Sequence, residues 1–177
     1  MTESPLSRLR LTIDSNFSDV CFIGLSVRAI CEHLRLDPVE AYRVELCAVE
    51  AVTNTIRHAY GNRTGAEVSV TVIVRDNQLD VEVADTGLAM LAAHVARLSR
   101  GSDVFGFDAQ DRSSVPEGGM GLQIMREAMD QVSYRTEGQV NCLQLTKRLN
   151  GQEQAAVGND SATADVCVED RNEGESI

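Results

Sequence analysis

Two periods of hydrophobic and polar positions follow one another along this chain and predict its helices and strands. Residues 8–14 alternate apolar with polar, which predicts a first strand. Apolar residues then recur at helical spacing through residues 18–34, with Ser18 in the position of an N-cap. The positions expected to face the core on this helix are Val20, Ile23, Val27, Ile30 and Leu34.

A second helix has clear start and stop signals. Asp37 can act as its N-cap, Pro38 suits the first helical position, and Glu40 completes a capping box. We expect this helix to end near Tyr60, because Gly61 can take the left-handed conformation of a C-cap.

After the helices the period changes to two, which predicts further strands. Four segments alternate in this way: residues 67–75 and 79–85 around an Asp-Asn-Gln turn, and residues 132–137 and 140–149 around Gly138-Gln139. The connection over residues 88–117 is long enough to suggest a functional flap, with one helix predicted at 89–98. The pattern therefore predicts an α+β fold, with helices on one face of a mostly antiparallel, mixed sheet.

Composition favours one domain followed by a tail. The chain has 177 residues, of which 43 % are hydrophobic, enough for one ordinary core. We expect the domain to span residues 8–149. The remainder, residues 150–177, contains seven acidic residues and one arginine and lacks aromatic residues, so a disordered, solvated tail is expected and a regulatory segment is the alternative.

Charge and cysteine content exclude several classes of partner and compartment. The net charge of −11 argues against nucleic acid or an anionic membrane as a partner. The sequence has no apolar run of about 18 residues and no apolar block near Met1, so we expect a cytoplasmic protein. No Cys-x-x-Cys pair occurs among its five cysteines, which we expect to be reduced and mostly buried: Cys21, Cys31, Cys47, Cys142 and Cys167.

Three polar residues share one face of the mostly apolar second helix. Glu50, Asn54 and His58 recur at intervals of four residues. An Asn54 side-chain oxygen suits Mg²⁺ that already carries phosphate oxygens and water. Glu50 could accept a proton from, or orient, a hydroxyl that attacks a terminal phosphate. For His58, packing or a hydrogen bond at the helix end is a better explanation than ligand contact.

An Asp-Thr-Gly sequence follows the third predicted strand. Asp85 could accept a hydrogen bond from an exocyclic amine such as that of adenine, and Gly87 would let a planar ring approach the backbone. Asp-Thr-Gly is also ordinary turn chemistry, and it is the signature of dimeric aspartic proteases. The long helical first half and the later glycine-rich loop have no role in such a protease.

A glycine-rich loop opens the last predicted helix. Gly118, Gly119 and Gly121, followed by Leu122, place free backbone N–H groups at the positive end of a helix, which favours an anion. The loop does not follow a strand and lacks a third glycine at the spacing that a dinucleotide-binding loop requires, and no Gly-Lys-Ser/Thr P-loop occurs. The three motifs together predict a site for Mg-ATP.

As an ordered set, these motifs resemble one family. E-A-V-T-N-x-x-x-H-A-Y, D-T-G, P-E-G-G-M-G-L-x-I-M, M-D-x-V-x-Y and G-x-x-N-x-L-x-L-x-K-R-L are similar to the RsbW-like anti-sigma-factor serine kinases of the GHKL ATPase superfamily, over roughly residues 8–149. The resemblance implies a Bergerat-type two-layer α/β sandwich that binds ATP and Mg²⁺ under a lid at about 88–117. It also implies transfer of phosphate to a STAS-domain antagonist protein and binding of a sigma factor, and it leaves homodimerisation open.

Carried over by position, the resemblance assigns a role to each motif. By this resemblance, Glu50 matches the position of the family's catalytic base and Asn54 that of its Mg²⁺ ligand. Asp85 and Gly87 match the residues that recognise adenine. The phosphate loop corresponds to Gly118, Gly119, Gly121 and Leu122. Leu88-Ala89 replaces the family's continuation D-x-G-x-G, which puts nucleotide affinity in doubt more than the fold. The alternative function is a non-catalytic, nucleotide-responsive anti-sigma or adaptor protein, and Glu50 favours the kinase.

Overall fold

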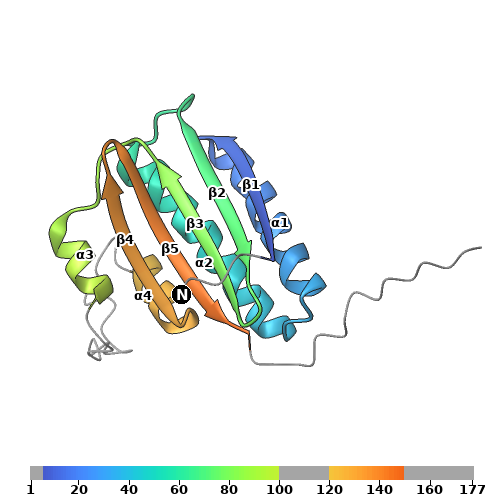
Figure 1. Cartoon of the computed structure of the whole chain (residues 1–177). Helices are drawn as coiled ribbons and strands as arrows, with labels where there is room; N and C mark the ends of the chain where they lie inside the picture. Colours follow the sequence, from blue (N-terminus) through green and yellow to red (C-terminus); the bar gives the residue numbers. More distant parts are fainter. Residues whose placement is uncertain (1–5, 100–119, 150–177) are drawn as a thin grey trace, which may run out of the picture.

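The computed structural model describes residues 6–99 and 120–149, which form a five-stranded sheet with helices on one face (Figure 1). The strand order is β1-β2-β3-β5-β4. The strands are β1 (Ser7–Asp14), β2 (Glu67–Val74), β3 (Gln78–Asp85), β4 (Gln131–Glu137) and β5 (Val140–Arg148). All four pairings are antiparallel, so the predicted α+β sandwich is confirmed and its sheet has no parallel pair among the described strands.

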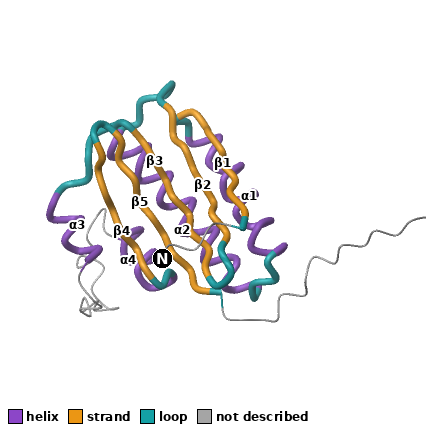
Figure 2. Tube along the Cα trace, viewed as in Figure 1, coloured by secondary structure: helices purple, strands orange, loops and turns teal. Residues whose placement is uncertain are grey.

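The helices form the second layer. They are α1 (Val20–His33), α2 (Pro38–Asn54), α3 (Ala92–Ser99) and α4 (Met120–Ala128), with short turns η1 (Phe17–Asp19) before α1 and η2 (Thr55–Ala59) after α2. In Figures 1 and 2, α1, α2 and α4 lie behind the sheet, and α3 lies beside its β4 edge. Helix α2 crosses the middle of the sheet, so its side chains meet both the strands and its neighbouring helices.

The core lies between the sheet and the helices, as the alternation predicts. In β3, the side chains of Leu79, Val81 and Val83 are buried in this core, whereas the intervening positions face the other side of the sheet. Val81 pairs with Val72 of β2 and Leu145 of β5 in the strand register, so one apolar row runs across the central strands.

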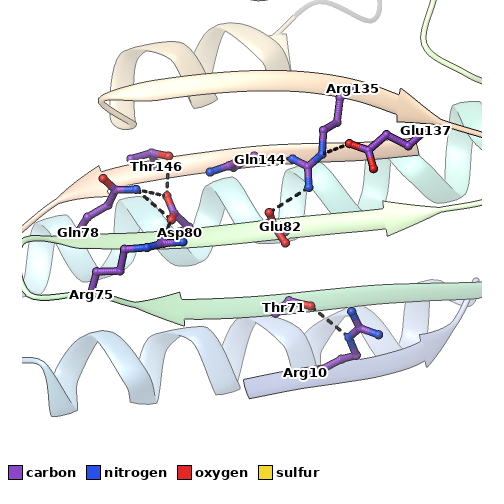
Figure 3. Close-up of polar contacts among 10 residues, drawn as sticks. All are labelled: Arg10, Thr71, Arg75, Gln78, Asp80, Glu82, Arg135, Glu137, Gln144 and Thr146. Carbon is purple, nitrogen blue, oxygen red and sulfur yellow. Dashed lines mark hydrogen bonds and ion pairs between the residues drawn. The ribbon is translucent and has the colours of Figure 1, made fainter. Parts of the chain in front are cut away.

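The other face of the sheet carries a layer of polar contacts (Figure 3). Within this layer Asp80 is fully buried: its carboxylate accepts hydrogen bonds from Gln78 and from the Thr146 hydroxyl at 2.6 Å, and it pairs with Arg75. A charge this deeply buried requires such partners. The long side chains that satisfy Asp80 also help to cover this part of the sheet.

The two helix starts differ in how well local sequence predicted them. Ser18 is not the N-cap of the first helix: the side chain of Asn16 accepts from the Ser18 backbone N–H at 3.1 Å and begins the turn η1, from which α1 continues. Asn and Ser both cap well, and the additional turn moves the cap upstream by two residues. Asp37 caps α2 as predicted, accepting from the backbone N–H of Val39 at 2.9 Å.

Glu40 does not complete the expected capping box. Its carboxylate pairs with Arg43 one turn along α2 and with Lys147 of β5. Lys147 also donates to the Ala128 carbonyl oxygen at the end of α4. The tertiary contact with Lys147 therefore prevails over the local bond to the helix N-terminus, and it joins α2, α4 and β5.

The remaining predicted elements appear with shifted ends. The helix predicted at 89–98 is α3, and both hairpins form. Gly61, directly after the C-cap residue Tyr60, has the expected left-handed φ of +59°, and Gly138 in the turn between β4 and β5 has φ of +62°. Residues 100–117 of the predicted flap and the predicted tail, residues 150–177, lie outside the described residues. Within the described ranges, the structure contains no helix with the length and apolar character needed to cross a membrane. The four described cysteines are free, and three of them are buried.

Candidate functional site

The structure brings the glycine-rich helix start onto the polar face of α2. Glu50 and Asn54 lie one turn apart on α2, and Gly121 lies in the first turn of α4. A Cβ atom at Gly121 would lie 2.7 Å from Glu50 Oε2 and 3.1 Å from Asn54 Nδ2. Two of the three motifs thus meet in space, and any side chain at position 121 would displace the Glu50 carboxylate.

The helix changes its winding immediately after Asn54. Thr55–Ala59 form a π-helical turn in which the Tyr60 backbone N–H donates to the Thr55 carbonyl at 3.2 Å. Such turns are often found at functional sites. His58 falls within this turn, is exposed, and has no hydrogen bond to another described residue, so the expected packing or helix-end role for His58 is not seen.

The Asp-Thr-Gly turn is docked on this π-helical turn. A Cβ atom at Gly87 would lie 2.5 Å from the Ala59 carbonyl oxygen, which also accepts from the Leu88 backbone N–H at 2.9 Å. Gly87 therefore has a structural reason to be glycine that does not involve a ligand. The sequence indicated close approach at Gly87 but not that the approaching group is the end of α2.

Tyr60 also binds the Asp-Thr-Gly turn, through its side-chain hydroxyl. Its hydroxyl donates to the Glu67 carbonyl oxygen at 2.7 Å and accepts from the Thr86 backbone N–H at 3.1 Å. The end of the helix that carries Asn54 and the strand end that carries Asp85 are consequently held at one relative position. Sequence reasoning did not identify Tyr60, although it lies in the H-A-Y segment of the quoted motif.

Asp85 is buried, and both hydrogen bonds described for its side chain go to one oxygen. The Gly87 backbone N–H donates to Asp85 Oδ1 at 2.8 Å, and the Asn141 side-chain amide donates to the same atom at 2.9 Å. Asn141 was also missed from the sequence. A signal existed, because Asn141 occupies a core-facing position of β5 at which its neighbours in the alternation, Leu143 and Leu145, are buried and apolar.

The predicted phosphate loop is described only in part. Gly121 and Leu122 lie in the first turn of α4, where Leu122 packs against the core, and Gly118 and Gly119 lie outside the described residues. The described residues contain no group of three or more His, Cys, Asp or Glu side chains that could hold a metal. Burial raises the pKa of the neighbouring Cys47 thiol to about 12, so this cysteine is protonated and not nucleophilic at neutral pH.

Comparison with solved structures supports the fold. A Mycobacterium tuberculosis structure containing RsbU and RsbW domains is similar with a TM-score of 0.57 at 14 % identity, covering 84 % of this chain and 34 % of that one. The SiaB–SiaC complex of Pseudomonas aeruginosa is similar with a TM-score of 0.52 at 16 % identity, covering 77 % of this chain and 88 % of that one. At these identities the similarity shows a shared fold.

Comparison with protein sequences shows the family. The model described as "Histidine kinase-like ATPase domain" matches residues 19–147. The anti-sigma F factor of Pasteuria penetrans is 30 % identical over 155 residues, which cover 86 % of this chain and 98 % of that protein. The serine-protein kinase RsbW of Bacillus subtilis (strain 168) is 28 % identical over 144 residues, covering 75 % and 80 %. The chain therefore belongs to the histidine kinase-like, or GHKL, ATPase domain family as an RsbW-like member.

Proposed function

We propose that this chain is an ATP-dependent serine/threonine protein kinase of a bacterial partner-switching pathway. Its substrate would be a STAS-domain antagonist protein, and it would also bind a sigma factor. The observation that supports this most directly is the approach of Gly121 to Glu50 and Asn54, because it sets a carboxylate, an amide and the N-terminus of α4 around one point. The names of the relatives, serine-protein kinase and anti-sigma factor, support the same function.

Glu50 is the proposed base. The acceptor hydroxyl oxygen forms a bond to the terminal phosphorus of ATP as the bond from that phosphorus to the bridging oxygen breaks and ADP leaves. The hydroxyl proton passes to the Glu50 carboxylate. Glu50 suits this role because it is only partly buried and has no hydrogen bond to another described residue.

Asn54 is the proposed protein ligand of Mg²⁺, which would neutralise charge on the phosphate oxygens when bound. The chemistry of the site fits this ion. Mg²⁺ retains several waters and phosphate oxygens and needs few protein ligands, so the single amide oxygen of Asn54 is sufficient although the described residues contain no cluster of three or more His, Cys, Asp or Glu side chains that could hold a metal. The backbone N–H groups of Gly118, Gly119 and Gly121, next to Leu122, are proposed to donate hydrogen bonds to the phosphate oxygens of ATP.

Asp85 is proposed to bind the adenine amine, with Gly87 beside it. The proposed partners are a STAS-domain protein and a sigma factor, which the family relationship supports, and no direct contact with nucleic acid or a membrane is proposed. The cytoplasm is the proposed location. The net charge of −11 supports protein partners over nucleic acid.

The first experiment is a calorimetric titration of the protein with ATP, with and without Mg²⁺, on the wild type and Asn54→Ala. We expect ATP to bind and the enhancement by Mg²⁺ to disappear in Asn54→Ala. Absence of ATP binding to the wild type under all conditions would refute the proposal.

Transfer is tested with terminally labelled ATP and purified STAS-domain proteins from the source organism. Glu50→Gln keeps the shape of the side chain and should lower transfer by about 100-fold or more, since general-base catalysis contributes about that much. The matched control is Glu45→Gln on the same helix. Glu45 forms a partly buried ion pair with Arg28 at 3.1 Å, outside the proposed site, and its replacement should leave phosphate transfer unchanged. Undiminished transfer by Glu50→Gln would exclude Glu50 as the base.

A second candidate function is a non-catalytic, nucleotide-responsive anti-sigma or adaptor protein. It is favoured by the relative named as an anti-sigma factor, of which this chain covers 98 %. This function would show partner binding that changes with ATP while no phosphorylated product accumulates. Transfer that depends on Glu50 would exclude it.

A further inference from the structure

We propose that Asn141 is a positioning residue that sets Asp85 to read an exocyclic amine, and that it thereby determines the preference of the site for adenine. It acts through Asp85 and does not itself touch the nucleotide. This inference rests on the proposed function, because it assigns to Asn141 a role in the nucleotide specificity of the same site.

Asn141 is an unusual residue for its place. It is 2 % exposed and lies on the core-facing side of β5, in register with Asp85 on one neighbouring strand and with Thr136 on the other. A buried amide without partners is costly, so a polar residue here must be matched on both sides. The strand register supplies these partners directly.

Every polar group of the Asn141 side chain is engaged. Its Nδ2 donates to Asp85 Oδ1 at 2.9 Å and to the Gly87 carbonyl oxygen at 3.1 Å, and its Oδ1 accepts from the Thr136 hydroxyl at 3.0 Å. A flipped amide would set its oxygen against the carboxylate and the carbonyl, which are both acceptors. The network therefore fixes which end of the amide faces Asp85.

This arrangement determines which oxygen of Asp85 is available. Oδ1 already accepts from Gly87 and Asn141, while no described residue donates a hydrogen bond to Oδ2. The same amide holds both the carboxylate and the Gly87 carbonyl, so the carboxylate cannot rotate without breaking bonds to the turn. Asp85 thus presents one oriented acceptor.

An oriented acceptor selects a ligand that has a donor. A purine with a 6-amino group, as in adenine, can donate to Oδ2, whereas a purine without this group cannot. A 6-oxo group would place a second acceptor against the carboxylate. Without Asn141, the Asp85 carboxylate retains its charge but loses its fixed orientation. The gain in affinity that the 6-amino group provides should then decrease.

The test is a cycle of affinities for ATP and for purine riboside triphosphate, which is the same nucleotide without the 6-amino group. Both are measured by calorimetry on the wild type, Asn141→Leu and Thr136→Val. Thr136→Val is the milder variant because Thr136 is exposed, so it keeps the test available if Asn141→Leu fails to fold. Thr146→Val is the matched control: it removes a buried hydroxyl from the same strand on the opposite face, where the hydroxyl donates to Asp80.

The wild type should prefer ATP by about 10- to 100-fold, the value of a hydrogen bond to a charged group. Asn141→Leu should reduce this preference to within about threefold, and Thr136→Val should reduce it partly, while Thr146→Val retains it. If Asn141 had only a structural role, its replacement would weaken the binding of both nucleotides equally. An unchanged preference for ATP in Asn141→Leu and Thr136→Val would overturn the inference. A wild type that binds both nucleotides equally would overturn it while the kinase proposal stands, whereas a wild type that binds neither would refute the proposed function itself.

Discussion

Gly121→Ala offers a test in which activity and stability should move in opposite directions. The added Cβ would lie 2.7 Å from Glu50 Oε2 and 3.1 Å from Asn54 Nδ2, whereas ordinary contact begins near 3.4 Å. The Glu50 oxygen must therefore retreat by about 0.7 Å. The Glu50 side chain is flexible enough to do this, so the variant should fold. The Glu50 carboxylate, however, should be displaced from its position in the site.

The size of both effects can be estimated. A misplacement of about 1 Å at a reacting group can lower a rate by about 100-fold. We expect a loss of transfer of about 10- to 100-fold, equivalent to about 1.4 to 2.7 kcal/mol of activation free energy. Alanine is favoured over glycine within a helix by about 1 kcal/mol, so the free energy of unfolding of Gly121→Ala should be unchanged or higher.

Two measurements check this prediction: single-turnover transfer from labelled ATP, and thermal unfolding of the same preparations. Gly65→Ala is the control, because Gly65 has φ of +81° and a Cβ there would meet nothing within 4 Å. That variant should lose about 1 kcal/mol of stability through backbone strain and keep its rate of transfer. Full-rate transfer by a folded Gly121→Ala would refute the reasoning that Gly121 is required by Glu50 and Asn54.

Three further predictions concern other parts of the structure. The hydrogen bond from Lys147 lowers the pKa of Glu40 below its ordinary value of 4.5. The ionised carboxylate thus stabilises the fold above about pH 4.5, and this stabilisation is lost as the pH falls through the lower pKa of the folded state. In denaturant unfolding, we expect Glu40→Gln to lower the free energy of unfolding by about 1 kcal/mol at pH 7 and by less below pH 4. In a thiol-labelling experiment at pH 8, the exposed Cys21 should react in the folded protein, and the buried Cys47, whose pKa burial raises to about 12, should react only after unfolding. Tyr60→Phe should cost about 1 to 3 kcal/mol in unfolding free energy and weaken ATP binding, because its hydroxyl joins the Asp-Thr-Gly turn to the start of β2.

Each of these has an outcome that contradicts it. A stability difference for Glu40→Gln that stays constant between pH 7 and pH 3 would mean that the contact with Lys147 does not favour the ionised carboxylate. Rapid labelling of Cys47 in the native protein, located by peptide mapping, would contradict its burial. Unchanged ATP affinity in Tyr60→Phe would mean that the turn is held without the hydroxyl.

Local patterns predicted the elements because they depend on neighbours within a few residues. Alternation over β2 and β3 requires only that successive side chains point to opposite faces, and Asp37 caps α2 through a bond to a backbone group two residues away. The same local reasoning misplaced the cap of α1 at Ser18, since Asn16 upstream serves equally well. It also missed the π-helical turn after Asn54, because residues 55–59 have no distinctive composition.

The sequence by itself determined the order of the elements, the shared face of Glu50 and Asn54, and the strand-end position of Asp85, because helix and strand periods settle these over short stretches of chain. Only the tertiary structure decided which atoms meet. The Tyr60 hydroxyl reaches Thr86 across 26 residues, the Asn141 amide reaches Asp85 across 56, and Gly121 packs directly on Glu50. Contacts of this range depend on how the helices pack on the sheet and on the register of β3 and β5, and no local period specifies either.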